Sequence, residues 1–288
     1  MHHIALLADK NDIKGTAMIK KLYPGGKGKA FNITYDDGVL QDIRFVELIN
    51  KYNIKGTFNL NSQLMEQQFE WTHPNGMAVK RLSENIVVDL YKGHEVASHT
   101  LTHPYMSDMV YGEIMRQLGR DKASLEQLFG AKVAGFAVPF DYYSPQIAQC
   151  AKNCGFEYAR MSQESLCYTP SEDYYWWQCG IFHLNPNLDS FVEGFLKTKE
   201  ELALCQIVGH SYDLDVEDMW DKMENIVARM AADRDVVSMT NIELVRYLKA
   251  IRSADISGNA ITNYSDMELW FSVKGSVVSV KPKEIYSF

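Results

Sequence analysis

Short apolar runs alternate with amphipathic stretches between residues 29 and 252, and this alternation restricts the chain to a small set of folds. Strands are predicted at residues 30–35, 56–60, 94–98, 133–138, 156–160, 205–208 and 236–239. Helical spacing and capping residues predict helices at residues 39–52, 83–91, 107–129, 144–153, 216–230 and 241–251. Strands that alternate with helices in this way indicate an α/β fold with a mainly parallel sheet.

Two segments depart from the alternation. Residues 168–188 are rich in aromatic residues and proline, and we expect an irregular, functional segment there. Residues 268–273 and 276–280 flank Lys274-Gly275, which is typical of a β-hairpin. We therefore expect a main domain over residues 1–254 and a small β extension over residues 255–288, packed on the main domain.

Charge and apolar content exclude some partners. The formal net charge is −8 and the lysines and arginines are scattered, which argues against nucleic acid. No apolar run approaches the roughly 20 residues that span a bilayer. Residues 4–8 are too short for a signal-peptide core, so we expect a cytoplasmic protein unless a signal was removed.

The five cysteines form no CxxC pair and are expected to be buried thiols. Nothing in the sequence fixes the oligomeric state.

Two adjacent carboxylates follow the first predicted strand. Asp36 and Asp37 stand between Tyr35 and Gly38. Successive strand residues point to opposite faces, so a turn at Gly38 is needed to bring both carboxylates into one site. The same triplet is also typical of an ordinary turn.

Three of the eight histidines follow predicted strands as well. His99 and His103 are four residues apart, and they face the same way if the backbone turns helically, which suits two ligands of one metal. His210 comes directly after the strand at residues 205–208. Because these polar groups all follow strands, a barrel with its site at the carboxyl ends of the strands is predicted.

These residues resemble the motifs of a known family. Tyr35-Asp36-Asp37-Gly38 is similar to the first motif of the polysaccharide deacetylases related to nodulation-factor deacetylase, carbohydrate esterase family 4. His99 and His103 match the second motif, His-Ser/Thr-x-x-His. Residues 136–140 resemble the third motif, and His210 stands where the last motif places a histidine. The resemblance runs from about residue 29 to residue 250.

The resemblance implies a distorted (β/α) barrel of about seven parallel strands with an Asp-His-His metal site. By position, Asp37, His99 and His103 would bind one divalent metal ion, with Asp36 as general base and His210 as general acid. A metal-bound water would then be the nucleophile. One carboxylate and two imidazoles suit zinc, and also cobalt, nickel or iron.

Other residues are expected near the substrate. The family holds the oxyanion with a backbone amide after the third-motif proline, here that of Phe140 after Pro139, and Tyr35 belongs to the first motif. The aromatic residues at 173–177 could stack on sugar rings or could cover the core, and we expect Trp177 to form a wall of the site. The family's fourth motif, an aspartate and a tryptophan that support the catalytic histidine, has Asp173 with Trp176 or Trp177 as its candidates. His183 is expected to be structural.

The third motif departs from the family at its first residue. The family normally has an arginine there, which orients the base, and this chain has Ala137. Alanine supplies neither the charge nor the paired hydrogen bonds of a guanidinium. We hypothesise that Arg160, at the end of the next predicted strand, reaches inward instead.

The resemblance implies a hydrolase that removes acetyl groups from N- or O-acetylated oligo- or polysaccharides. Loss of the usual arginine leaves two alternatives open. The chain could hydrolyse another non-peptide carbon–nitrogen amide bond, or it could be a catalytically impaired carbohydrate-binding homologue. Retention of both Asp36 and His210 argues against the impaired homologue, because binding alone requires neither.

Overall fold

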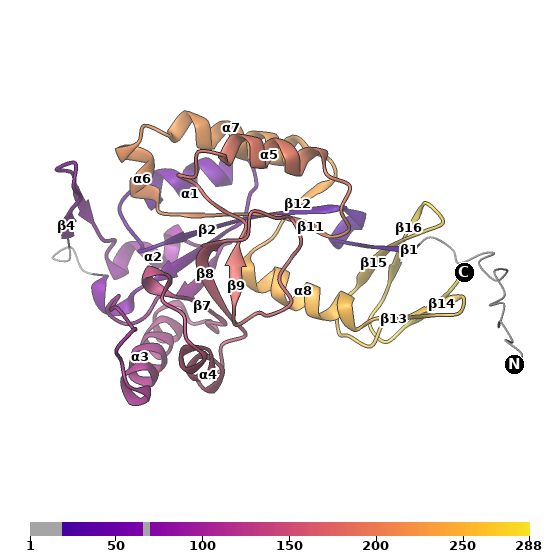
Figure 1. The fold of residues 1–288 in the computed structure, drawn as a ribbon, viewed down its shortest axis with the longest axis horizontal. Coiled ribbons are helices and arrows are strands. Elements are labelled where there is room, and N and C mark those ends of the chain that lie inside the picture. The colour runs from indigo at the N-terminus through magenta and orange to yellow at the C-terminus, as the bar shows by residue number, and fades with distance from the viewer. Residues whose placement is uncertain (1–18, 66–69) are drawn as a thin grey trace, which may run out of the picture.

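A parallel sheet of nine strands forms the centre of the protein in the computed structural model, which describes residues 19–65 and 70–288 (Figure 1). The strand order is β10-β11-β2-β3-β6-β7-β8-β9, with β12 beside β2. The strands are β2 (Lys29–Asp36), β3 (Gly56–Leu60), β6 (Glu95–Ser98), β7 (Gly135–Ala137), β8 (Tyr158–Glu164), β9 (Trp177–Cys179), β10 (Ile181–Phe182), β11 (Ala203–Gly209) and β12 (Val236–Ser238). Contacts of β8 with β10 and of β9 with β11 nearly close the sheet into a barrel.

The seven predicted strands are present, and the predicted (β/α) barrel is confirmed. Two strands of this sheet were missed, β9 and β10, and both lie in the segment at 168–188 that was expected to be irregular. They span three and two residues, which is too short for an alternating pattern. Each pairs with a longer parallel neighbour, β9 with β8 and β10 with β11, so tertiary pairing stabilises them.

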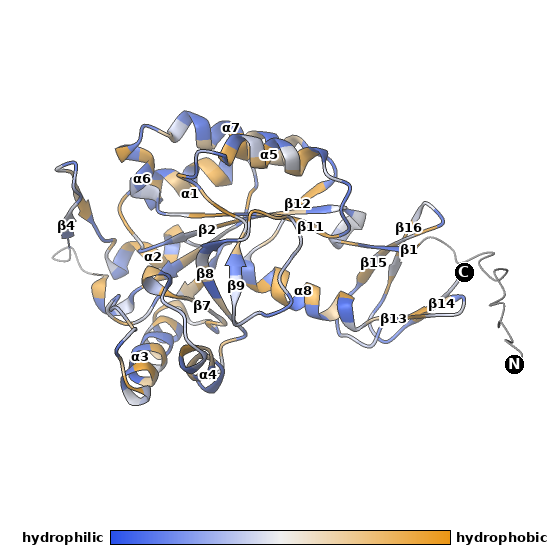
Figure 2. Ribbon diagram, in the orientation of Figure 1, coloured by the Kyte–Doolittle hydropathy of each residue, from blue (hydrophilic) through white to orange (hydrophobic). Residues whose placement is uncertain are grey.

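Helices cover both sides of the sheet, with α1, α5 and α7 on one side and α3 and α4 on the other (Figure 1). They are α1 (Asp42–Lys51), α2 (Glu84–Leu90), α3 (Tyr111–Phe129), α4 (Pro145–Asn153), α5 (Leu188–Lys197), α6 (Ser211–Val216), α7 (Trp220–Ala232) and α8 (Asn241–Ser253). Figure 2 shows hydrophilic and hydrophobic residues on the same helices, as expected where one face packs on a sheet. The six predicted helices are present, and the sequence analysis missed α5 and the short α6.

Local sequence explains several helix ends. Gly130 follows α3 with φ +62°, the left-handed conformation that glycine adopts at low cost and that ends many helices. Ser144 precedes α4 and its side chain accepts a hydrogen bond from the Ile147 amide, with Pro145 in the first turn.

Among the described residues, no helix combines the length and the apolar character that a membrane crossing requires.

The C-terminal residues form two small antiparallel sheets at one end of the molecule (Figure 1). One has the order β13-β14-β17, from Asp255–Ser257, Ala260–Thr262 and Ile285–Ser287. The other has the order β1-β15-β16, from Ile19–Leu22, Leu269–Val273 and Ser276–Val280. The predicted hairpin is therefore present, as β15 and β16. The predicted boundary at residue 254 placed β1 with the main domain, whereas β1 pairs with β15 of the extension.

Candidate metal and catalytic site

A cavity of about 600 Å³ opens among the loops that follow the carboxyl ends of the barrel strands. Asp36 and Asp37 reach it from β2, His99 and His103 follow β6, and His210 follows β11. The structure thus brings together five polar side chains that lie as much as 174 positions apart in the sequence. Parallel strands end at the same rim of a barrel, which explains this convergence.

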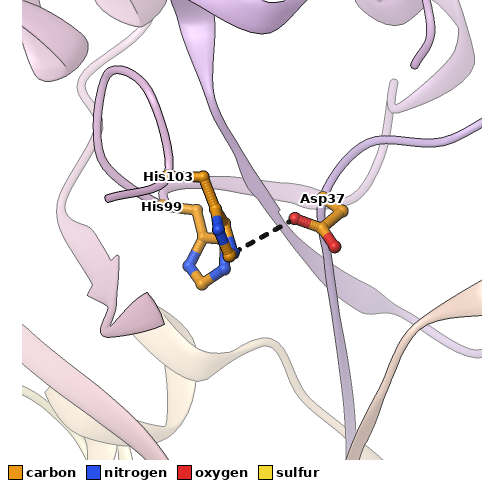
Figure 3. Close-up of side chains that lie close together, drawn as sticks. All are labelled: Asp37, His99 and His103. Atoms are coloured by element: carbon orange, nitrogen blue, oxygen red, sulfur yellow. Dashed lines mark ion pairs between the residues drawn. The ribbon is translucent and has the colours of Figure 1, made fainter. Parts of the chain in front are cut away.

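Asp37, His99 and His103 form a compact cluster (Figure 3), in which one potential ligand atom of each lies within 4.8 Å of the others. The backbone that presents them is strained. Asp37 has φ +84° and His103 has φ +51°, in a region that residues other than glycine seldom adopt. The two imidazoles converge without a helical turn, because Thr100 between them also has a positive φ of +71° and the segment is not helical. Strain of this kind is concentrated at functional sites.

Hydrogen bonds fix the orientation of His99. Its Nδ1 donates to the Ala137 carbonyl oxygen at 2.9 Å, since a carbonyl can only accept. The proton therefore lies on Nδ1, and Nε2 is free to bind a metal. The Asn61 side chain donates to the Thr100 carbonyl at 2.8 Å and steadies the loop that carries both histidines.

Asp37 has an atom suited to a cation. Its Oδ1 is buried and receives no hydrogen bond of suitable geometry, although Arg81 Nη2 lies 3.0 Å away and His103 Nε2 lies 3.5 Å away. A buried carboxylate oxygen without a hydrogen bond is costly unless something else compensates it. A divalent cation among Asp37, His99 and His103 would supply that compensation, so these residues fit the metal expected from the sequence.

The protonation states also suit metal ligation. Burial lowers the pKa of His99 to about 4, and it also lowers the pKa of His103, so both imidazoles are neutral at pH 7. Burial by itself would raise the pKa of Asp37, but Arg81 and the neighbouring histidines hold it below its usual range. A charged carboxylate and two neutral imidazoles are the forms that bind a metal ion.

Asp36 is paired with Arg160. The guanidinium Nη2 of Arg160 contacts Asp36 Oδ1, and Asn59 Nδ2 donates to the same oxygen at 2.7 Å. Burial opposes ionisation of Asp36, but Arg160, with His99 and His210, keeps its pKa below the ordinary value. Arg160 is fully buried, which its ion pair with Asp36 makes tolerable.

The position of Arg160 explains how the chain dispenses with the arginine missing at position 137. Ala137 in β7 and Arg160 in β8 are register partners in the parallel sheet. Register partners point to the same face, so the guanidinium enters the barrel at the same level from the adjacent strand.

His210 belongs to a buried chain of hydrogen bonds. Its Nδ1 lies 3.0 Å from Asp213 Oδ2, and His183 Nε2 lies 3.0 Å from the same oxygen. The Tyr35 hydroxyl lies 2.8 Å from His183 Nδ1. Since an ionised carboxylate only accepts, both histidines donate to Asp213, and Tyr35 donates to His183.

These hydrogen bonds and the nearby carboxylates set the charge of His210. Burial would lower its pKa, but the hydrogen bond to Asp213 and the charges of Asp37 and Asp36 raise it to about 9. Burial would raise the pKa of Asp213, but its hydrogen bonds from His183 and His210 lower it to about 2. His210 is therefore a cation at pH 7, and its Nε2 lies 4.0 Å from Asp37 Oδ2.

Three expectations about the surrounding residues need revision. Trp177 is not a wall of the site: it is 2% exposed and its ring lies edge-on to Tyr158 in the core. The Tyr35 side chain points away from the cavity toward His183. Asp173 does not support His210, because its carboxylate accepts the backbone amides of the next turn, at Tyr175 and Trp176. His183 is buried between Tyr35 and Asp213 and lies outside the cavity lining, which agrees with the structural role expected for it.

The third-motif residues are divided between core and cavity. Pro139 is buried, and Phe140 lines the cavity with 48% of its surface exposed and a positive φ of +55°. The Phe140 ring stacks on Tyr105 at 3.8 Å between centroids and meets the edge of His103 at 4.5 Å.

Asp213, Arg81 and Trp71 are among the site residues that were missed in the sequence. Asp213 could have been found, because it stands three positions after His210 at the start of a helix, where the two side chains can meet. No sequence pattern marked Arg81 or Trp71. Arg81 pairs with Asp37 and directly follows β5, and Trp71 lines the cavity from β4. Both strands span only three residues and form a hairpin.

Comparisons with known proteins agree with the motifs. The family model for polysaccharide deacetylase matches residues 24–159, which include Asp36, Asp37, His99 and His103 and end just before Arg160. YlxY, an uncharacterized protein of Bacillus subtilis (strain 168), is 27% identical over 108 residues. That match covers 38% of this chain and only 29% of the length of YlxY.

Solved structures share the fold at low sequence identity. A Mycobacterium smegmatis protein assigned to the polysaccharide deacetylases superimposes with a TM-score of 0.59 and 13% identity, covering 81% of this chain and 94% of that one. A family 4 acetyl xylan esterase from Clostridium thermocellum, in complex with a cobalt ion, gives 0.52 and 16%, covering 76% and 91%. A mutant of BA3943, a family 4 pseudoenzyme with restored enzymatic activity, gives 0.51 and 17%, covering 78% and 70%. The resemblance seen in the sequence is confirmed.

Proposed function

This chain has the fold of the polysaccharide deacetylases of carbohydrate esterase family 4, and from this premise we propose that it is a metal-dependent deacetylase of N- or O-acetylated carbohydrate. The observation that carries the proposal is the placement of Asp36 and His210 beside three residues that could hold a metal ion. Asp36 and His210 both line the cavity that contains Asp37, His99 and His103.

Asp37, His99 and His103 would hold the ion, with His99 binding through Nε2. When bound, a divalent ion with three protein ligands polarises an acetyl carbonyl and makes water more acidic. Zinc suits this donor set best, and cobalt, nickel or iron would also be accepted.

The reaction is a hydrolysis in which the oxygen of water adds to the acetyl carbonyl carbon. Asp36 is ionised beside Arg160 and accepts the proton that the water loses. The bond from the carbonyl carbon to the sugar oxygen or nitrogen then breaks, and His210, held as a cation by Asp213, protonates the leaving group. The products are acetate and the free hydroxyl or amine. The Phe140 backbone amide, at the cavity, would donate to the oxyanion.

Arg160 and Asp213 would act as positioning residues in this scheme. Arg160 keeps Asp36 ionised and oriented, and Asp213 keeps His210 protonated and oriented. Arg160 contacts Asp36, the proposed base. The alanine at position 137 therefore no longer favours hydrolysis of a different amide bond over deacetylation.

The test is acetate release from acetylated chito- and xylo-oligosaccharides, with and without added zinc or cobalt. We expect metal-dependent release by the unaltered protein, and a loss of at least about a hundredfold in Asp36→Asn and His99→Ala. Asp89→Asn, on the exposed face of α2, is the matched control and should retain full activity.

Metal content is measured in parallel. His99→Ala should bind less than stoichiometric zinc, because His99 is one of the three proposed metal ligands. Asp36→Asn should bind zinc normally, because Asp36 is not one of them. Stoichiometric zinc without acetate release from any acetylated carbohydrate would contradict the proposed reaction. The protein would then be a binding homologue or a hydrolase of another amide.

A further inference from the structure

A β-hairpin that was not predicted from the sequence lies next to Asp37, His99 and His103, the proposed metal ligands. It consists of β4 (Glu70–Thr72) and β5 (Ala78–Lys80), with Trp71 opposite Val79 in the antiparallel register. In Figure 1 it projects from the barrel at the end opposite the C-terminal sheets. Trp71 is half-buried and lines the cavity of the candidate site.

The base of the hairpin is fixed to the loop that carries Asp37. Leu40 donates its amide to the Lys80 carbonyl at 2.9 Å, and Leu82 donates its amide to the Gly38 carbonyl at 2.8 Å. Val79 is fully buried and anchors the strand. The position of Trp71 is therefore defined relative to the metal ligand.

Trp71 is one end of an aromatic wall that leads to the proposed acid. Its ring meets Tyr212 edge-on at 5.5 Å between centroids, and Tyr212 stacks on the His210 ring at 5.0 Å with an interplanar angle of 20°. The Arg81 guanidinium lies 5.2 Å from the centre of the Trp71 ring. A second aromatic residue, Phe140, lines the His103 side of the cavity, and Tyr105 stacks on its ring.

The chemistry of these walls indicates a class of ligand. Aromatic faces bind the apolar C–H faces of a pyranose ring, with hydroxyl groups left to polar partners. Both cations that line the cavity already face carboxylates: Arg81 lies 3.0 Å from Asp37, and His210 lies 3.0 Å from Asp213. Neither is left to pair with a phosphate or carboxylate of the substrate. The cavity therefore suits an uncharged sugar ring.

We propose that Trp71 is a specificity-determining residue that stacks on an uncharged pyranose ring adjacent to the acetylated position. The inference rests on the proposed deacetylase function and adds a substrate class to it. The role resembles the one expected for Trp177, which is buried in the core instead.

The first arm of the test is steady-state kinetics of Trp71→Ala and Trp71→Phe with zinc added. For an acetylated xylo-oligosaccharide, Trp71→Ala should raise KM by about tenfold with kcat within about threefold, and Trp71→Phe should lie between. For a small acyclic acetyl ester, which has no ring to stack, both variants should match the unaltered protein. Equal KM values for the oligosaccharide in all three proteins would overturn the inference.

Trp176→Ala is the matched control. Trp176 is 41% exposed, packs against Tyr143 at 4.0 Å and does not line the cavity, so its removal should leave KM unchanged. Because Trp71 also contacts Arg81, zinc stoichiometry and circular dichroism of Trp71→Ala are measured to verify an intact site. An equal rise in KM for Trp176→Ala would overturn the assignment to Trp71.

The second arm separates this inference from the proposed reaction. Binding of an unacetylated xylo- or chito-oligosaccharide to the zinc-loaded protein is measured by calorimetry, which requires no turnover. Binding that is lost in Trp71→Ala but kept in Trp176→Ala supports the inference even if no acetate is released. If acetate is released but Trp71→Ala binds and reacts normally, the deacetylase proposal stands and the inference fails. Absence of sugar binding to the unaltered protein in both arms overturns the inference.

Discussion

Arg160 and Ala137 illustrate how one side chain can be supplied from a neighbouring strand. The two residues are register partners in β7 and β8, and the guanidinium of Arg160 contacts Asp36 across the barrel interior. Sequence alone could propose this substitution of one arginine for another, because Arg160 ends the next predicted strand. Only the strand register places both residues on the same face at the same level.

Replacing Arg160 with alanine should lower kcat by at least about tenfold, because Asp36 would lose the charge that keeps it ionised. Adding Ala137→Arg to that variant should restore part of the activity from the adjacent strand. Acetate release measures both, with circular dichroism to verify folding. Turnover of Arg160→Ala close to that of the unaltered protein would show that Arg160 is merely structural.

The pH profile depends on Asp213. His210 acts as an acid only while protonated, and its pKa of about 9 sets the upper limit of that range. Activity should therefore be lost as the pH rises through about 9. Asp213→Asn removes the charge that raises this pKa, so the basic limb of the kcat profile should move to lower pH by at least about one unit. An unmoved limb would mean that another group gives the proton.

At the scale of elements, β11 and β10 pair in the sheet just before His210, the proposed acid. Gly209 ends β11, and a Cβ there would lie 2.5 Å from the His183 ring. His183 is held between Tyr35 and Asp213, so it has little freedom to yield. Glycine at this strand end is thus required by the close approach of a side chain.

Gly209→Ala should displace His183, lower the free energy of unfolding by about 1–3 kcal/mol and reduce kcat. Chemical denaturation and acetate release measure the two effects. Gly119→Ala is the matched control: its Cβ would lie 3.8 Å from the nearest atom, Cys154 Sγ, within a helix, so it should be neutral or stabilising. Equal stability of the two variants would show that the His183 ring can move aside.

Four of the strands that were not predicted from the sequence share a physical property. β4, β5, β9 and β10 each span two or three residues, too few to show a strand period, and exist because a longer neighbour or a partner strand pairs with them. The longer strands β2, β3, β8 and β11 were found because their apolar runs extend over five to eight residues. β2 was predicted at residues 30–35 and observed at Lys29–Asp36.

At the scale of the whole molecule, the C-terminal sheets share a core with the barrel. Phe271 in β15 is fully buried in one cluster with Tyr247 and Leu248 of α8. The same cluster includes Tyr23 and Ala30, close to the start of β2. The division at residue 254 therefore separates segments that pack against each other, and we expect them to unfold together.

Phe271→Ala should destabilise the whole protein by about 3–5 kcal/mol, because it leaves a cavity in that shared core. Denaturant unfolding followed by tryptophan fluorescence should show one transition, shifted to lower denaturant. Val277→Ala, on the neighbouring strand and 54% exposed, should change stability by less than about 0.5 kcal/mol. A separate early transition, with the main transition unmoved, would indicate an independent C-terminal domain.

The sequence by itself determined the (β/α) barrel, its long strands and the three residues that could hold a metal ion, because period and motif are local properties of the chain. Tertiary structure decided which side chains support that cluster. Arg81, Asp213 and Trp71 reach the site from a hairpin and a short helix whose positions follow from packing, and Trp177 is excluded from it for the same reason. A strand period says which face a residue occupies, but only the closure of the barrel says what that face meets.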